Sequence, residues 1–301
     1  MNPMSAQNSN IFDNLKRFFS QGSTLAILII INTCIWIVIQ IIRVFLFLYG
    51  EPDSSIAMTQ LFSFLALPAS LPKLIMMPWT LLTYMFFHID IWHILFNMLW
   101  FYWFGKIFLD YLSGKKLLLV YILGGISGGL LYILTFNVFP VFSSMLPKSY
   151  ALGASAAVMA VVTAISFYVP NYSLNLLFIG KVKIIYLAII LFIFDFFMIP
   201  AGNSGGHLAH IGGALFGFLY IQFLPAGKIK FFNNLFTRKR KPYSAYSTGG
   251  TSRPLTDEDY NLQKAERQKH TDEILEKISK GGYDSLSKEE KEFLFKSSSK
   301  K

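Results

Sequence analysis

The chain has 301 residues, of which 53% are hydrophobic, 30 are phenylalanine and only 15% are charged. So little charge excludes a disordered chain and argues strongly against an ordinary soluble globule, in which about a quarter of the residues are charged. The single cysteine, Cys34, excludes a disulfide framework and a cysteine-based zinc site.

The charged residues lie mostly at the C-terminal end. Residues 24–226 hold 8 Lys/Arg and 5 Asp/Glu, whereas residues 227–301 hold 17 Lys/Arg and 11 Asp/Glu. This distribution predicts a membrane-embedded body followed by a solvated tail. The net charge of +10 is therefore not interpreted as a nucleic-acid footprint, and the expected partner is the lipid bilayer, with no nucleic acid.

In chain order, a polar segment at residues 1–23 comes first and is expected to be cytoplasmic. Six apolar stretches follow it, near residues 24–48, 91–112, 117–137, 151–169, 183–200 and 207–224. Each is long enough to cross a hydrocarbon core of roughly 30 Å as a helix. The sequence therefore predicts an all-α integral membrane protein, whose domain at residues 24–226 is a bundle of six transmembrane helices.

The positive charges predict how these helices are oriented. The short connections after the second and fourth stretches carry lysines, and the basic cluster Arg238–Lys241 follows the sixth. With six crossings all of these charges fall on one side, so the positive-inside rule places both termini in the cytoplasm. The partly apolar outer loop at residues 50–78 is expected to lie in the membrane interface.

The C-terminal residues divide into a basic linker at 227–256 and a cytoplasmic helical tail at 257–301. In the tail, Ser287 with Glu290 fits a helix-capping box. Short helices of this kind bury little surface, so the tail is expected to dock on a partner, which the sequence does not identify, or to stay mobile.

Polar side chains at membrane depth are costly and are therefore candidates for function. His93 and Asn97 share one face of the second helix, Ser155 begins the fourth helix after Gly153, and His210 lies near the start of the sixth. Taken singly, each has a structural alternative: an interfacial histidine, an asparagine that links helices, or a serine at a packing position. The three helices are expected to run in the same direction, so the three sites lie at a similar depth, as hydrolysis below the outer surface would need.

The residue types fit the chemistry of a serine hydrolase. Ser155 would be the nucleophile and His210 the general base that takes its proton. Gly213 and Gly217 form a small-residue face that lets the sixth helix approach the fourth closely enough for that hydrogen bond. The start of a helix favours developing negative charge, and the polar side chains of the second helix supply donors for an oxyanion hole.

Two further polar features have other interpretations. His207 and His210 have the i, i+3 spacing of a metal-binding pair, but no carboxylate or cysteine accompanies them in sequence, and neither a metal nor another cofactor is predicted. Asp195 could be an intramembrane ion site, although its place five residues before Pro200 favours a satisfied interfacial residue. These residues leave a transporter or channel as one further functional class.

The same polar residues resemble the motifs of the rhomboid family of intramembrane serine proteases, over about residues 24–226. The family's His-x4-His-x3-Asn pattern is matched by His88, His93 and Asn97. Its Gly-x-Ser motif is matched by Gly153 and Ser155, and its Ala-His-x2-Gly-x3-Gly motif by Ala209, His210, Gly213 and Gly217.

This resemblance implies a role for each matched residue. Ser155 would be the nucleophile and His210 the base of a dyad that has no acid. The oxyanion donors map to His93, Asn97 and the backbone N–H of Ser155, with Gly153 in support, and His207 receives no catalytic role. The expected protein cleaves transmembrane or juxtamembrane segments of membrane proteins through an acyl-enzyme, in the bacterial inner membrane.

The chain departs from the family pattern at three places. Ala156 follows the serine where the family usually has glycine, Met159 stands for an aromatic residue, and Thr80 stands for the arginine of a Trp-Arg pair. None of these departures removes a catalytic group. They do motivate an alternative function, that of a catalytically inactive rhomboid-like protein that binds client transmembrane helices.

Overall fold

The computed structural model describes residues 22–50, 56–176 and 180–223, and parts of residues 270–294. The chain divides into two compact units, one made of residues 1–108 and 114–239 and the other of residues 109–113 and 240–301. Most of the predicted N-terminal segment, and the whole basic linker with its Arg238–Lys241 cluster, lie outside the described residues. The predicted domain boundaries stay predictions.

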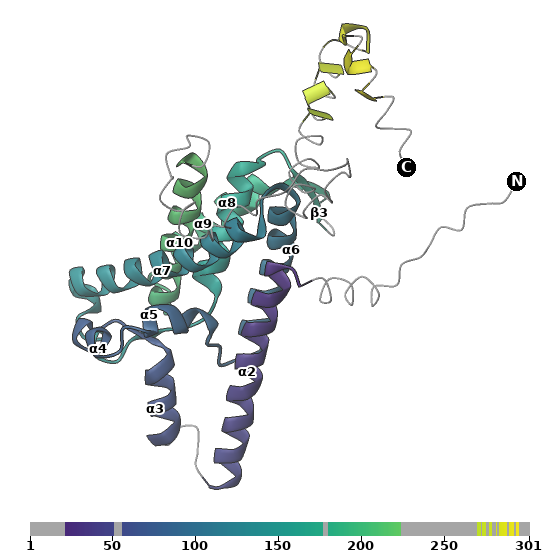
Figure 1. Ribbon diagram of the computed structural model, residues 1–301. Coiled ribbons are helices and arrows are strands. Elements are labelled where there is room, and N and C mark those ends of the chain that lie inside the picture. Colours follow the sequence, from purple (N-terminus) through teal and green to yellow (C-terminus); the bar gives the residue numbers. More distant parts are fainter. Residues whose placement is uncertain are drawn as a thin grey trace, which may run out of the picture. The chain divides into compact units, whose positions relative to one another are not determined.

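Long helices make up most of the described chain (Figure 1). They are α2 (Thr24–Leu48), α6 (Ile91–Tyr111), α7 (Gly114–Val138), α8 (Ser155–Tyr168), α9 (Ile184–Met198) and α10 (Ser204–Phe223). These are the six apolar stretches that the sequence predicts to be helical, with ends that differ by a few residues. Among the described helices, α2 and α7 are long and apolar enough to cross a membrane. The count of six crossings stays a prediction.

Shorter elements connect the long helices. Between α2 and α6 lie α3 (Ile56–Leu65), β1 (Leu67–Pro68), α4 (Leu71–Met76), α5 (Thr80–Thr83) and η1 (Tyr84–Phe86). Between α7 and α8 lie η2 (Pro140–Phe142) and β2 (Tyr150–Ala151), and between α8 and α9 lie β3 (Ser173–Leu176) and β4 (Gly180–Lys183). The outer loop that the sequence placed in the interface thus has short helices of its own.

The two strand pairs correct the prediction of a purely helical chain. β1 pairs antiparallel with β2, with Leu67 opposite Ala151, and β3 pairs antiparallel with β4. The second pair has a local cause, because β3 alternates polar and apolar residues with the period of a strand. The first pair shortens α8, since residues near 151 that the sequence assigned to the helix lie in β2 instead.

The helices α7, α8 and α10 pack backbone against backbone. A Cβ placed on Gly213 of α10 would overlap the carbonyl oxygen of Ala156 on α8. A Cβ placed on Gly128 of α7 would lie 2.5 Å from the carbonyl oxygen of Ala209 on α10. Glycines allow this close approach, which maximises van der Waals contact where burial from water cannot drive helices together.

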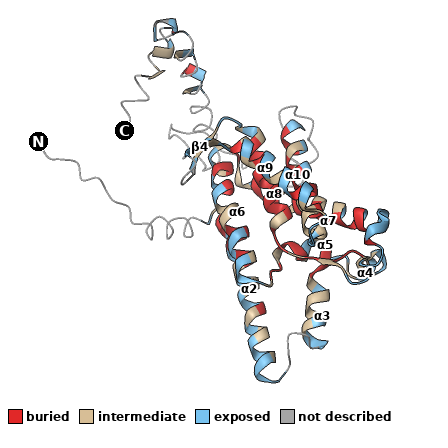
Figure 2. Cartoon of the chain, turned by 180° about the vertical axis from the view of Figure 1, so that it is seen from behind, coloured by how far each residue is buried: buried red, intermediate tan, exposed pale blue. Residues whose placement is uncertain are grey.

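Two other helices carry many exposed residues (Figure 2), and large apolar side chains are among them. On α2, Phe45 is 58% exposed and Val44 is 56% exposed, and on α9 Phe197 is 69% exposed. Large apolar patches of this kind mark a surface that contacts something other than water. The apolar composition predicts that this surface contacts lipid.

The second unit contains the described part of the tail. The Ser287 N–H donates to Glu290 Oε2 at 2.8 Å, and the Glu290 N–H donates to Ser287 Oγ at 3.2 Å, which is a reciprocal capping box. Lys277 Nζ pairs with Glu290 Oε1 at 2.5 Å. Ile274 is buried, and η4 (Tyr283–Ser285) precedes the box.

Candidate active site

The segment that precedes Ser155 is held by backbone hydrogen bonds. The Gly153 N–H donates to the carbonyl oxygen of Tyr84 at 2.9 Å, and the Ala154 N–H donates to Nε2 of His88 at 3.1 Å. Gly153 has a φ of +107°, a conformation that glycine adopts without steric strain. Ser155 follows as the first residue of α8, so its hydroxyl stands at the start of that helix.

His88 serves this segment as a hydrogen-bond acceptor. Its side chain is fully buried, and burial, together with the neighbouring His93, lowers its pKa to about 3. His88 is therefore neutral near pH 7, which leaves Nε2 able to accept the Ala154 N–H. In the sequence His88 matches the family pattern but has no assigned role, and the His-x4-His spacing is the signal that it belongs to the site.

His93 of α6 lies against the serine segment. A Cβ on Gly153 would lie 2.6 Å from Cε1 and Nε2 of the His93 ring, so a glycine is needed to leave room for the ring. The side-chain amide of Asn97 donates to the carbonyl oxygen of His93 at 2.9 Å. The structure thus brings His93 to the segment before Ser155 and ties Asn97 to the backbone of α6.

The contact between α8 and α10 sets the direction of the two helices. Gly213 lies against Ala156, and Gly217, one turn further along α10, lies against Ala160, one turn further along α8. Both contacts advance by the same step, so the two helices run parallel at close range. Their N-terminal ends therefore lie at the same end of the bundle.

His210 and Ser155 consequently lie at one level. His210 is one turn before Gly213 on α10, and Ser155 directly precedes Ala156 on α8. In the described part of the chain, no hydrogen bond joins the Ser155 hydroxyl to His210, and none engages the Ser155 backbone N–H.

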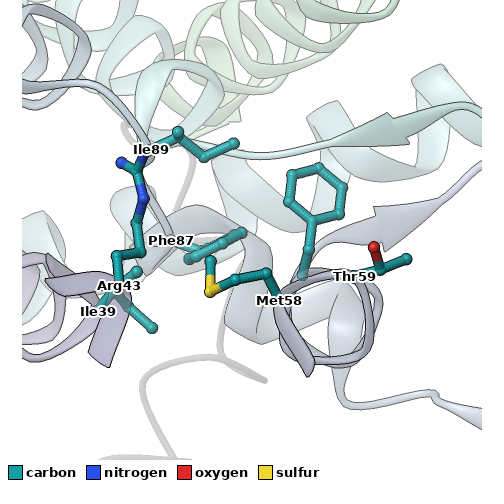
Figure 3. A pocket seen from close by; sticks show the side chains of 7 residues that line it. Ile39, Arg43, Met58, Thr59, Phe87 and Ile89 are labelled. Carbon is teal, nitrogen blue, oxygen red and sulfur yellow. The ribbon is translucent and has the colours of Figure 1, made fainter. Parts of the chain in front are cut away.

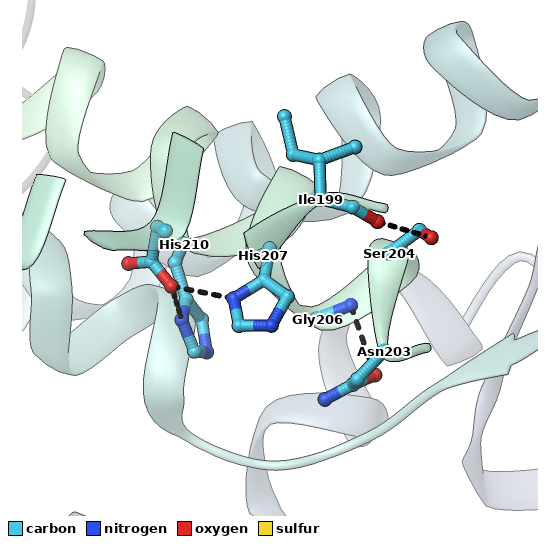
Figure 4. A network of polar contacts seen from close by, with 7 residues as sticks. Ile199, Asn203, Ser204, Gly206, His207 and His210 are labelled. Atoms are coloured by element: carbon cyan, nitrogen blue, oxygen red, sulfur yellow. Dashed lines mark hydrogen bonds and ion pairs between the residues drawn. The ribbon is translucent and has the colours of Figure 1, made fainter. Parts of the chain in front are cut away.

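A buried carboxylate joins two histidines of α10 to α9 (Figure 4). Oδ1 of Asp195 lies 2.8 Å from Nδ1 of His207 and 2.9 Å from Nδ1 of His210. The Asp195 residue is only 5% exposed. The sequence favours a satisfied interfacial residue at Asp195 and assigns His207 no catalytic role. In the structure the carboxylate is satisfied by the two histidines, one of which is the candidate base.

The helical hairpin formed by α9 and α10 is the sequence feature that could have predicted the contact between Asp195 and His207. Asp195 and His207 stand at equal distances from the middle of the turn that connects the two helices, so antiparallel pairing brings them together. The turn itself is fixed at the start of α10, where Ser204 Oγ donates to the carbonyl oxygen of Ile199 at 2.6 Å and the Gly206 N–H donates to Asn203 Oδ1 at 3.3 Å.

The same three side chains have the composition of a metal site. The ligand atoms of Asp195, His207 and His210 all lie within 4.8 Å of one another. Two imidazoles and a carboxylate suit zinc or another divalent transition metal. The prediction that the protein uses no metal therefore stays a prediction, and the cluster has two possible uses, one as a hydrogen-bond network and one as a ligand set.

A cavity of about 300 Å³ is lined by other residues (Figure 3). It is bounded by α2, α3 and the segment before α6, and its walls include Ile39, Arg43, Phe62 and Phe87. None of the candidate catalytic side chains lines it. The cavity is therefore not part of the candidate active site.

Comparison with known proteins identifies a family for the region that contains these residues. The model of the Rhomboid domain matches residues 76–226, and a family of unknown function (DUF6576) matches residues 256–300. RHOMBOID-like protein 12, mitochondrial, from Arabidopsis thaliana is 31% identical over 161 residues, which cover 50% of this chain and 48% of that protein. The chain thus spans about half the length of this relative. Together with the apolar helices, the family match indicates a membrane protein.

Proposed function

Because the chain belongs to the rhomboid family, we propose that it is an intramembrane serine protease that cleaves transmembrane or juxtamembrane segments of other membrane proteins. One observation carries this proposal. The glycine contact between α10 and α8 sets His210 level with Ser155, at the place where His93 meets the segment before the serine.

The proposed reaction proceeds through an acyl-enzyme. Oγ of Ser155 attacks the scissile carbonyl carbon while Nε2 of His210 takes the hydroxyl proton. The negative charge that develops on the carbonyl oxygen is stabilised by the Ser155 N–H, at the positive end of α8, and by donors from His93 and Asn97. His210 then gives its proton to the leaving amine, and a water molecule, activated by the same base, hydrolyses the ester.

Rhomboid membership and the apolar helices that carry the site support a substrate that is itself a membrane protein. A peptide bond within a helix is shielded by its own backbone hydrogen bonds, so a substrate helix must unwind locally before Ser155 can reach it. Substrate residues that weaken helices, such as glycine and proline, should therefore promote cleavage. We further propose a bacterial inner-membrane location with both termini in the cytoplasm, and a reaction that needs no cofactor.

A second candidate function is a catalytically inactive membrane protein that binds client transmembrane helices. The observation that favours it is the lack of a hydrogen bond between the Ser155 hydroxyl and His210 in the described part of the chain. Ala156, which places a methyl group next to the nucleophile, and Met159, which replaces an aromatic residue of the family pattern, point the same way.

Labelling with a serine-reactive fluorophosphonate distinguishes the two candidates. Detergent-solubilised wild type should be labelled, whereas Ser155→Ala should lose labelling entirely and His210→Ala should lose it by at least about 10²-fold, the usual contribution of a general base. Ser144→Ala, at an exposed serine, and His270→Ala, in the tail, are the matched controls and should label like wild type. Absence of labelling in folded wild type would refute the protease and favour client binding.

A further inference from the structure

We propose that Asp195 is a positioning residue for the candidate base, so that the site works as a Ser155–His210–Asp195 triad, with His207 as a second donor that holds the carboxylate in place. This proposal rests on the proposed function. It departs from the acid-free dyad that the family resemblance implies. It is carried by the position of a single carboxylate oxygen between two imidazole nitrogens of α10.

The hydrogen bonds to Asp195 determine which nitrogen of His210 can act as a base. An ionised carboxylate can only accept hydrogen bonds, so the Nδ1 atoms 2.8 and 2.9 Å from Oδ1 must be the donors. In a neutral imidazole the proton is on one nitrogen, and here that nitrogen is Nδ1. Nε2 of His210 therefore carries the lone pair, and Nε2 is the atom that must take the proton of Ser155.

The burial of the contact strengthens its effect on the imidazolium that forms during the reaction. The side chain of Asp195 is 7% exposed and that of His210 is 22% exposed, so little water screens the pair. When His210 accepts a proton at Nε2, its positive charge lies beside the carboxylate. Asp195 thus fixes the orientation of the ring before the reaction and stabilises its charge during it, as the acid of a Ser-His-Asp triad does.

His207 has a different task, because its ring is bound to the same oxygen. A carboxylate at the end of a flexible side chain needs a second partner to hold one rotamer, and the Nδ1–H of His207 supplies it. The short turn between α9 and α10 keeps both histidines opposite Asp195. His207 therefore acts on the reaction through Asp195, so its removal has no further effect once the carboxylate has been replaced.

The test compares variants that keep the shape of the side chain. Asp195→Asn should lower kcat by about 10²–10⁴-fold with KM nearly unchanged, because the amide no longer favours the Nδ1–H tautomer of His210. Asp195→Glu should restore part of the lost rate. Asp110→Asn, at an exposed carboxylate on α6, is the matched control and should stay within about twofold of wild type.

The histidine variants test the second part of the proposal. His207→Asn, whose amide nitrogen can stand near the place of Nδ1, should lose less activity than His207→Ala. The double variant Asp195→Asn with His207→Ala should be no slower than Asp195→Asn alone. Effects that multiply in the double variant would overturn the shared role, since residues that act as one unit are not additive.

A spectroscopic measurement gives a readout that does not need activity. In the ¹⁵N-histidine spectrum of wild type, the His210 resonances, assigned by their loss in His210→Ala, should show a protonated Nδ1 that changes in Asp195→Asn. An unchanged spectrum, or an unchanged kcat in Asp195→Asn while wild type is labelled by fluorophosphonate, would overturn the positioning role and leave the protease standing. Activity that a chelator abolishes would assign the cluster to a metal and also overturn the role. A folded wild type that neither cleaves nor labels would overturn both proposals.

Discussion

Gly213→Ala is the substitution that most directly tests how the candidate site is assembled. The new Cβ would overlap the carbonyl oxygen of Ala156 and lie 2.8 Å from its carbonyl carbon and 3.2 Å from its Cα. All three atoms belong to the backbone of α8, so no change of rotamer can relieve the contact. The two helices must separate, or α10 must rotate.

The size of the effect follows from these distances. Ordinary contacts of a Cβ begin near 3.4 Å, so the nearest backbone carbon must recede by more than half an ångström and the oxygen by more than 1 Å. Forcing an extra methyl group into a packed interface costs about 1–3 kcal/mol. His210 is one turn from Gly213 and moves with α10, and a displacement of about 1 Å in a catalytic group can cost about 10²-fold in rate.

The assay measures stability and nucleophile activation in the same sample. We expect Gly213→Ala to lower the thermal unfolding midpoint in detergent and to slow fluorophosphonate labelling of Ser155 by about 10²-fold. Gly105→Ala adds the same methyl group to α6, where its three nearest atoms all belong to the side chain of Leu25 and not to a backbone, and should label at close to the wild-type rate. Wild-type stability and labelling in Gly213→Ala would refute the argument that the α8–α10 contact sets the site.

Two further predictions concern the segment before the serine. Because the folded-state pKa of His88, about 3, lies below its ordinary 6.5, the unfolded chain binds the proton more readily, and stability is lost as the pH falls below about 6.5. Lowering the pH from 7 to 5 should reduce the free energy of unfolding by about 2 kcal/mol. His88→Gln keeps a hydrogen-bond acceptor that does not titrate, so it should flatten this pH dependence in unfolding curves measured in detergent. An equal loss of stability in wild type and His88→Gln would contradict the assignment of the pH dependence to His88. Gly153→Ala, at φ +107°, would also press a Cβ against the His93 ring, whereas Gly202→Ala carries the same backbone strain at φ +111° and meets nothing within 4 Å. Only Gly153→Ala should lose labelling, by more than about tenfold, and equal labelling of the two variants would speak against the ring contact.

The long helices were predictable because each is a long apolar run that ends near a proline or glycine. The start of α8 was not, because whether Tyr150 and Ala151 continue the helix or form a strand is decided by pairing with Leu67 and Pro68, far away in the chain. A strand of two residues carries no periodicity of its own. The local sequence pattern therefore predicts where the helices lie, whereas tertiary structure determines which distant segments pair as short strands.

The candidate site shows the same division. Ser155, His93 and His210 could be grouped from the sequence because each stands near the start of a helix that is expected to run in the same direction. The partners of Asp195 could not, because they depend on how the turn after α9 sets the rotation of α10. The role of His88 depends on the fold of the segment before Ser155, which no local pattern specifies.

Because α10 packs closely against α8, the candidate site can be completed only after α10 has been synthesised and inserted. Translation delivers Ser155, His93 and Asp195 before α10 has left the ribosome. Until α10 inserts beside α8, the nucleophile of the proposed protease has no base, and the carboxylate has no histidine to orient. A nascent or truncated chain that ends before Ser204 is thus inert toward the membrane proteins that are inserted around it.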